Sequence, residues 1–327
     1  DTAIYQNIFA KEPKPNWWEQ KLWAWYDVPP IAGNFFNTTT IAYSGELDKQ
    51  KQAADLMTAA FNREGLALPH LIGLKTGHKY EPKVKAELSK KIDATVNRGR
   101  NVYAPKVRLV THTLRHNRMK WVTIHGLEQH WRPARVEAEN VADYKFAVKT
   151  TNVTALMLGK LKVPNQGTTE YTVTIDGQVL KTKPDRLKPI LLRKFGDKWD
   201  VVTSLAMNSL VKLPGLQGPI DDAFLDRFLF VKPTGKPMNA AIGQWVEREM
   251  NDAILQWHRQ FRGRAPAIKD IHLTRNDLRQ NLILWGDPSS NSFIKKIAGH
   301  LPIEWTKKGI QLKDKSWPAD KFVPVLI

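Results

Sequence analysis

The sequence predicts an α/β protein in three parts, and three observations about its pattern support this prediction. Residues 1–104 alternate short β-rich runs with segments that have the period of an amphipathic helix. Residues 105–204 have little helical period and contain many short strand patterns. Residues 205–327 return to a mixture of strand and helix patterns. We therefore expect an α/β part, then a small β-sandwich domain, then a C-terminal mixed α/β domain.

The first part reads as strand, helix, strand, helix. A β-rich run at residues 39–44 ends at Gly45, and a second run covers residues 68–74. Between them, residues 49–62 place apolar side chains at helical spacing, and Gly65 follows as a stop signal. A second helix is predicted over residues 81–96, because Pro82 stands at its start and Gly99 follows its end. This order is typical of parallel strands joined by helices.

The second part reads as a series of strands with tight turns. Asp176-Gly177 is a hairpin signal before a strand at residues 178–181, and Gly196-Asp197 is another turn signal. Short strands at such regular intervals suggest a small β-sandwich. The predicted strands cover residues 107–114, 121–127, 135–140, 144–149, 154–158, 169–175 and 190–195.

The third part mixes both patterns. A strand at residues 227–231 precedes a long amphipathic helix at residues 241–262, which Gly263 ends. A strand at residues 281–285 breaks at Gly286, and a helix follows over residues 290–299. The apolar run 322–327 reads as a strand, and the first residue is Asp1 rather than Met. We therefore expect a piece of a longer polypeptide or a processed product.

Composition limits the classes of protein. The chain has 327 residues, of which 42% are hydrophobic and 25% charged, and these values are typical of a folded protein. No apolar run reaches the roughly 20 residues that a membrane-spanning helix needs. Cysteine is absent, which excludes disulfides, thiolate metal sites and cysteine nucleophiles. Fifty Lys and Arg against 32 Asp and Glu give a formal net charge of +18.

Two loops of the first part carry candidate catalytic residues. Asp48 follows the first predicted strand and His78 follows the second. If the two strands are parallel, both loops lie at the same edge of the sheet. A carboxylate beside an imidazole is what a hydrolase triad requires, because the carboxylate orients the imidazole that takes a proton from a serine. This spacing makes Asp48 and His78 candidate catalytic residues, although a histidine after glycine can also be an ordinary loop residue.

The segments around these residues resemble a known family. YSGELDKQKQAADLM and LIGLKTGHKYEP are similar to the last third of a prolyl oligopeptidase-like α/β-hydrolase domain, and the resemblance extends over most of the chain. It implies that residues 1–104 hold the last strands and helices of that sheet, with Asp48 as triad acid and His78 as base. It also implies a peptide or ester substrate, no cofactor, and a secreted, periplasmic or envelope location.

The chain departs from this family at the nucleophile. The family needs a Gly-x-Ser-x-Gly segment before the acid, and no such segment occurs here. The serine is therefore expected from an upstream part of the same polypeptide or from a second chain, and this chain alone should be inactive. The alternative function is a non-catalytic basic protein that binds carbohydrate or an acidic surface or serves as a scaffold.

Other interpretations of single residues stay open at this point. Asp48 could cap the following helix, Glu46 is a second candidate acid, and His70 is expected to be structural. His112 and His116, with two more histidines nearby, would share a strand face and could suggest zinc, although we expect no metal site.

Three further features have ordinary explanations. The segment 281–291 could bind an anion or form a plain turn, capped by Ser289 or Ser290. The aromatic cluster within residues 17–26 could line a cleft or pack in a core. The positive charge is spread along the chain without a nucleic-acid motif, so no specific nucleic-acid partner is expected.

Overall fold

A computed structural model describes residues 16–159, 170–183, 188–205 and 211–326. It contains both helices and several β-sheets, which confirms the general α/β class. The chain divides into two compact units, residues 1–214 and 215–327, which we describe separately. Among the described residues, no helix is both long and apolar enough to cross a bilayer.

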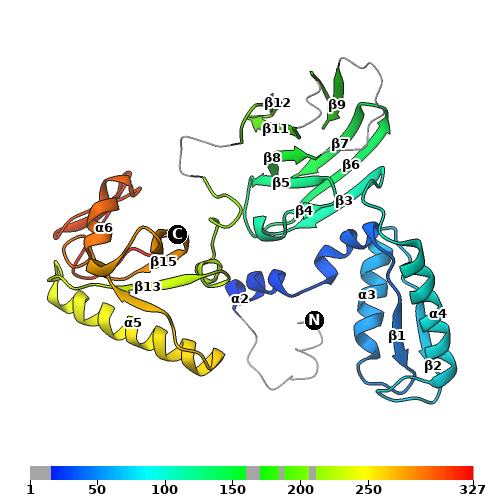
Figure 1. The fold of residues 1–327 in the computed structure, drawn as a ribbon, viewed down its shortest axis with the longest axis horizontal. Helices are drawn as coiled ribbons and strands as arrows, with labels where there is room; N and C mark the ends of the chain where they lie inside the picture. The colour runs from blue at the N-terminus through cyan, green and yellow to red at the C-terminus, as the bar shows by residue number, and fades with distance from the viewer. Residues whose placement is uncertain (1–15, 160–169, 184–187, 206–210, 327) are drawn as a thin grey trace. The chain divides into compact units, whose positions relative to one another are not determined.

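The first unit begins with helical turns and a small parallel sheet. Strands β1 (Ala42–Gly45) and β2 (His70–Gly73) pair in parallel and are joined by helix α3 (Lys51–Arg63). Helix α4 (Pro82–Arg98) follows β2, and both helices run alongside the two strands (Figure 1). These elements agree with the strand–helix order predicted from the sequence. From residue 16 onward, three short helices precede them: α2 (Trp17–Leu22), η1 (Trp23–Trp25) and η2 (Pro29–Asn37).

Two five-stranded sheets make up the rest of this unit. One has the order β10-β9-β7-β6-β3 and the other β12-β11-β8-β5-β4. Inward-facing side chains of both sheets form one hydrophobic cluster, in which Leu109, Val136, Ile124, Leu156 and Trp199 are almost fully buried. The strands are β3 (Lys106–Thr111), β4 (Arg118–Met119), β5 (Val122–Leu127), β6 (Ala134–Ala142), β7 (Lys145–Thr151), β8 (Val153–Leu158), β9 (Tyr171–Ile175), β10 (Gln178–Thr182), β11 (Ile190–Phe195) and β12 (Lys198–Val202).

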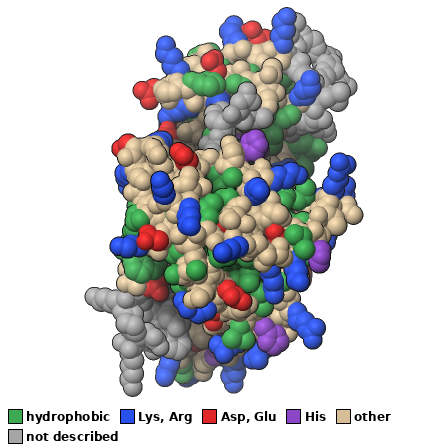
Figure 2. Space-filling view, turned by 90° about the vertical axis from the view of Figure 1, so that its left-hand side faces the viewer, with side chains coloured by type: hydrophobic (Ala, Val, Ile, Leu, Met, Phe, Trp, Pro, Cys, Tyr) green, Lys and Arg blue, Asp and Glu red, His purple; other side chains and the backbone are tan. Residues whose placement is uncertain are grey.

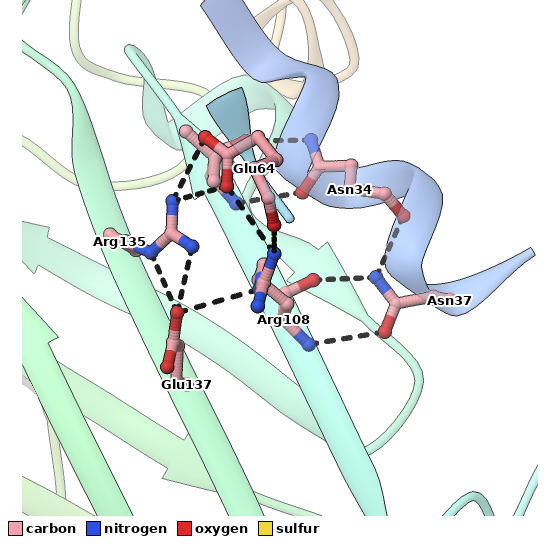
Figure 3. Close-up of polar contacts among 7 residues, drawn as sticks. Asn34, Asn37, Glu64, Arg108, Arg135 and Glu137 are labelled. Carbon is pink, nitrogen blue, oxygen red and sulfur yellow. Dashed lines mark hydrogen bonds and ion pairs between the residues drawn. The ribbon is translucent and has the colours of Figure 1, made fainter. Parts of the chain in front are cut away.

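Two side chains of η2 form hydrogen bonds with the backbone of the edge strand β3. The side-chain amide of Asn34 donates to the carbonyl of Val110 (2.8 Å) and accepts from its N–H (2.7 Å). Asn37 makes the same pair of bonds with the backbone of Arg108 (2.6 and 3.1 Å). The two amides therefore take the place of a neighbouring strand at an edge that would otherwise stay unpaired (Figure 3).

A charged cluster joins α3 to the same sheet. Glu64, just after α3, accepts from Arg135 of β6 (2.9 Å) and lies 3.3 Å from Nη1 of Arg108 on β3. Glu137 holds the other side of Arg135 at 2.7 Å (Figure 3). These side chains are partly buried, so the charges are screened less than in an exposed pair. The cluster connects the end of α3 to the sheet that contains β3 and β6.

The second unit contains a three-stranded parallel sheet. Its order is β14-β13-β15, and residues 228–231 of the central strand are all buried. Helix α5 turns Val246 and Met250 inward, and Trp257 packs on Phe228 with ring centroids 4.5 Å apart. The elements are η4 (Ile220–Phe224), β13 (Phe228–Lys232), α5 (Ala240–Phe261), β14 (Ala267–Lys269), η5 (Asp270–His272), η6 (Asp277–Arg279), β15 (Asn281–Leu284), α6 (Ser292–Ile297), η7 (Ala298–His300), β16 (Glu304–Trp305), β17 (Gly309–Leu312) and β18 (Lys315–Pro318).

Two expectations about local structure were wrong. Strand β3 ends at Thr111, and His116 belongs to a turn of helix, η3 (Leu114–His116), so His112 and His116 do not share a strand face. The hydroxyl of Thr111 donates to the carbonyl of Thr113, which helps to turn the chain there. The apolar run near the C-terminus is also not a strand over its described residues 322–326.

Candidate active site

The candidate site lies where β1 and β2 end. The register pairs Ala42 with His70 and Gly45 with Gly73, so the two strands stop at the same level. The loop 46–50 follows β1, and the loop 74–81 follows β2. Because the strands are parallel, both loops leave from one edge of the sheet, which is where open α/β sheets place their functional groups.

The two loops cross in close contact. A Cβ atom at Gly45 would overlap the carbonyl oxygens of Thr76 and Gly77, so only glycine fits at this point. The N–H of Leu47 donates to the carbonyl of Thr76 at 3.0 Å, and the N–H of Glu46 donates to that of Gly73 at 2.9 Å. The backbone thus brings the residues after β1 directly against those that precede His78.

Asp48 and His78 lie in hydrogen-bond contact. Nδ1 of His78 is 2.9 Å from Oδ2 of Asp48, although 30 residues separate them in sequence. The other oxygen, Oδ1, accepts from the N–H of Gln50 at 2.9 Å. The side chain of Asp48 is 13% exposed, and that of His78 is 76% exposed. The geometric condition for a catalytic acid and base is therefore met.

The environment of Asp48 favours its ionised form. The backbone N–H of Gln50, and next the hydrogen bond with His78, hold the pKa of Asp48 below its usual value. An ionised carboxylate accepts hydrogen bonds only, so the proton between the two groups belongs to Nδ1 of His78. In a neutral imidazole, Nε2 then carries a lone pair and can accept a proton.

The structure shows the hydrogen-bond partners for each alternative interpretation of Asp48, Glu46 and His70. Gln50 is the N-cap residue of α3, but its side chain makes no capping bond, and Oδ1 of Asp48 accepts the N–H of Gln50. Asp48 therefore also stabilises the turn that leads into α3, which agrees in part with the capping interpretation. Glu46 accepts from the N–H of Lys75 at 2.8 Å and makes no bond with His78 in the described structure. His70 pairs with the hydroxyl of Ser44 at 3.0 Å, and burial is the main cause of its lowered pKa. His70 therefore has a structural partner of its own.

A residue that the sequence did not single out fixes the second loop. The hydroxyl of Tyr43, on β1, donates to the carbonyl of Lys79 at 2.9 Å and accepts from the N–H of Glu81 at 2.8 Å. A Cβ atom at Gly73 would overlap this hydroxyl, so glycine there makes room for the phenol. In the sequence, the only sign of this arrangement was Gly73 at the end of β2, the strand that pairs with β1.

The other candidates from the sequence do not form a second centre. The structure places His112, His116, His125 and His130 in one unit, but among the described residues no three His, Asp or Glu form a group that could hold a metal. In the segment 281–291, the cap of α6 is Asn291, whose side chain accepts from two N–H groups of the helix, rather than Ser289 or Ser290. The oxygens of Asp287 accept backbone N–H groups, including that of Met238 at 2.8 Å.

The aromatic cluster divides into packed and exposed members. Trp25 contacts the rings of Trp131 and His116, with centroids 5.5 and 5.7 Å away. Trp17 and Tyr26, in contrast, are 66% and 78% exposed. Contacts with other rings therefore account for the partly buried Trp25 but not for the whole cluster.

Comparisons with known proteins gave no relative. Neither the scan against protein-family models nor the searches of curated proteins and of solved structures found a match for this chain. The likeness to prolyl oligopeptidase-like hydrolases therefore rests on the sequence motifs, and the activity that it implies is a proposal.

Proposed function

We propose that this chain supplies the acid and the base of a Ser–Asp–His triad in a hydrolase that cleaves peptide or carboxylic ester bonds. The observation that carries the proposal is the 2.9 Å contact between Asp48 and His78 at the end of two parallel strands. The nucleophilic serine would come from an upstream part of the same polypeptide or from a second chain. In this proposal residues 1–104 are the last part of the hydrolase sheet, followed by a β-sandwich domain at 105–204 and a mixed α/β domain at 205–327.

The chemistry follows from the state of the dyad. Nε2 of His78 would take the hydroxyl proton of the serine as its oxygen attacks the substrate carbonyl. Asp48 would stabilise the imidazolium that forms, and His78 would then give the proton to the leaving amine or alcohol. Water would attack the resulting acyl ester, again with His78 as base, and release the acid and the free serine.

The exposure of apolar side chains within the first 100 residues supports the proposal that further strands or helices cover the sheet of β1 and β2. Parallel sheets are normally covered on both faces, yet Leu71 and Ile72 of β2 are only half-buried. No described residue of α4 is buried, and Ile92 and Val96 on this helix are 49% and 69% exposed. A two-stranded sheet with such exposed apolar side chains is expected to be stable only when further strands or helices cover it.

The competing function is a basic binding or scaffold protein without catalysis, acting on carbohydrate or an acidic surface. It draws on the net charge of +18. Figure 2 shows Lys and Arg side chains scattered over the face in view rather than gathered in one patch. The charges on that face do not point to a particular acidic partner, whereas the Asp48–His78 contact points to a particular reaction.

The test is kinetic and uses the native polypeptide or assembly that contains this chain. Hydrolysis of a p-nitrophenyl ester and of a peptide p-nitroanilide is measured for the wild type and for His78→Ala, Asp48→Asn and His300→Ala. His300 is an exposed histidine of the second unit and serves as the control. We expect His78→Ala and Asp48→Asn to lower kcat by roughly 10³-fold or more. Unchanged turnover in folded His78→Ala protein would leave the binding or scaffold function.

A further inference from the structure

The position of His78 depends on its loop rather than on packing around its ring. Its side chain is 76% exposed, and Asp48 is the only hydrogen-bond partner of the ring among the described residues. A side chain held at one atom stays in place only if its backbone does. The features that fix the loop 74–81 therefore decide how much of the time the imidazole meets the carboxylate.

The beginning of this loop is fixed to the loop after β1. The N–H of Lys75 donates to Oε2 of Glu46 at 2.8 Å, and the carbonyl of Thr76 accepts from Leu47 at 3.0 Å. Both bonds lie before His78 in the chain. They leave open how the residues after His78 are held.

One phenol bonds the end of the loop to β1. The hydroxyl of Tyr43 bonds to the carbonyl of Lys79, which is the residue after His78, and to the N–H of Glu81. A single oxygen acts as donor and as acceptor, so both of its hydrogen-bonding roles are used. The ring also packs against Tyr80, with centroids 4.7 Å apart. Tyr43 belongs to β1, so the strand that leads to Asp48 also holds the loop of His78.

We propose that Tyr43 is a positioning residue that holds the loop 74–81 so that His78 stays in contact with Asp48. This inference rests on the proposed function for its catalytic meaning, but its geometric part does not need the serine. Without the hydroxyl, the carbonyl of Lys79 and the N–H of Glu81 would bond to water, and the end of the loop would gain freedom. The imidazole would then spend more time away from the carboxylate.

The first test uses this chain alone and compares Tyr43→Phe with Tyr80→Phe. Tyr80 is the matched control, because it is 54% exposed and its hydroxyl makes no hydrogen bond within the described residues. Nitrogen-15 NMR measures the fraction of neutral His78 that carries its proton on Nδ1. We expect a high fraction in the wild type and in Tyr80→Phe, and a shift of several-fold toward the Nε2–H tautomer in Tyr43→Phe. An unchanged tautomer ratio in Tyr43→Phe would overturn the proposal.

A second pair of variants guards against a general loss of structure in Tyr43→Phe. Glu81 has a backbone φ of −73°, which proline can adopt. Glu81→Pro removes the N–H that donates to Tyr43 and puts a ring carbon where the hydroxyl lies, so the phenol is displaced, whereas Glu81→Ala keeps the N–H. Both variants lose the carboxylate that caps α4. We expect the tautomer shift in Glu81→Pro and a smaller one or none in Glu81→Ala. Equal ratios in the two variants would count against Tyr43 as the residue that holds the loop.

A kinetic measurement then separates this inference from the proposed function. In the native polypeptide or assembly, Tyr43→Phe should lower kcat by about tenfold with little change in KM, because it affects how often the base is in place. If the tautomer shifts but the wild type has no His78-dependent turnover, the positioning role stands and the hydrolase proposal fails. If turnover depends on His78 but both kcat and the tautomer ratio are unchanged in Tyr43→Phe, the positioning role fails and the hydrolase proposal stands.

Discussion

The amide of Asn34 provides a test of how the first unit is held together. Asn34→Ala removes two hydrogen bonds, to the N–H and to the carbonyl of Val110. Val110 is only 5% exposed, and β3 is the last strand of its sheet, so neither water nor a neighbouring strand readily replaces them. Each bond contributes about 1 kcal/mol, and a buried group left without a partner costs about 1–3 kcal/mol. We expect the free energy of unfolding to fall by about 2–4 kcal/mol.

Urea unfolding, followed by circular dichroism, measures this loss, and hydrogen exchange of the Val110 amide locates it. Asn97→Ala, an exposed asparagine of α4, should change stability by less than about 0.5 kcal/mol. Asn34→Asp keeps an acceptor for the N–H of Val110 but places a carboxylate against its carbonyl, so it should not rescue the protein. If Asn34→Ala and Asn97→Ala lower the free energy of unfolding by the same small amount, the hydrogen bonds of Asn34 at the edge of β3 do not stabilise the fold.

Two further predictions concern stability. Burial lowers the pKa of His112 and of His125, so these side chains are harder to protonate in the folded state than in the unfolded state. The free energy of unfolding should therefore be highest above pH ~6.5, the pKa of an unfolded histidine, and should fall as the pH drops toward the lower pKa of the folded state. Urea unfolding at pH 7.5 and 5.5 should show this fall, and His112→Gln should reduce it; an identical fall in that variant would contradict this account. Glu64→Gln should lower the free energy of unfolding by about 1–3 kcal/mol, less at high salt, because two arginines lose one of their two carboxylate partners. Glu87→Gln, in an exposed pair with Lys91, should have almost no effect on stability. Equal losses in Glu64→Gln and Glu87→Gln would refute the stabilising role of the partly buried charged cluster around Glu64.

The sequence was sufficient for features that depend on local pattern. Apolar runs of β-rich residues predicted β1 and β2, and the helical period between them predicted α3. Parallel pairing then followed from the single helix between the strands. That step placed Asp48 beside His78, since the ends of neighbouring parallel strands share an edge.

The features that the sequence did not reveal depend on partners far away in the chain. Asn34 and Val110 are 76 residues apart, and nothing local to Asn34 shows which strand edge its amide covers. Tyr43 resembles an ordinary strand tyrosine until Lys79 and Glu81 are placed beside it. The spacing of His112 and His116 predicts one strand face, because the turn formed by Thr111 and Thr113 leaves no mark in the apolar pattern.

The reaction of the native polypeptide or assembly with a fluorophosphonate tests the central claim most directly, because this reagent modifies an activated serine much faster than other side chains. The rate of labelling is compared between the wild type and folded His78→Ala protein, and the modified residue is identified by mass spectrometry. We predict rapid labelling of one serine outside this chain, and a rate at least about a hundredfold lower in His78→Ala. The absence of any labelled serine, or a labelling rate that does not depend on His78, would contradict the account.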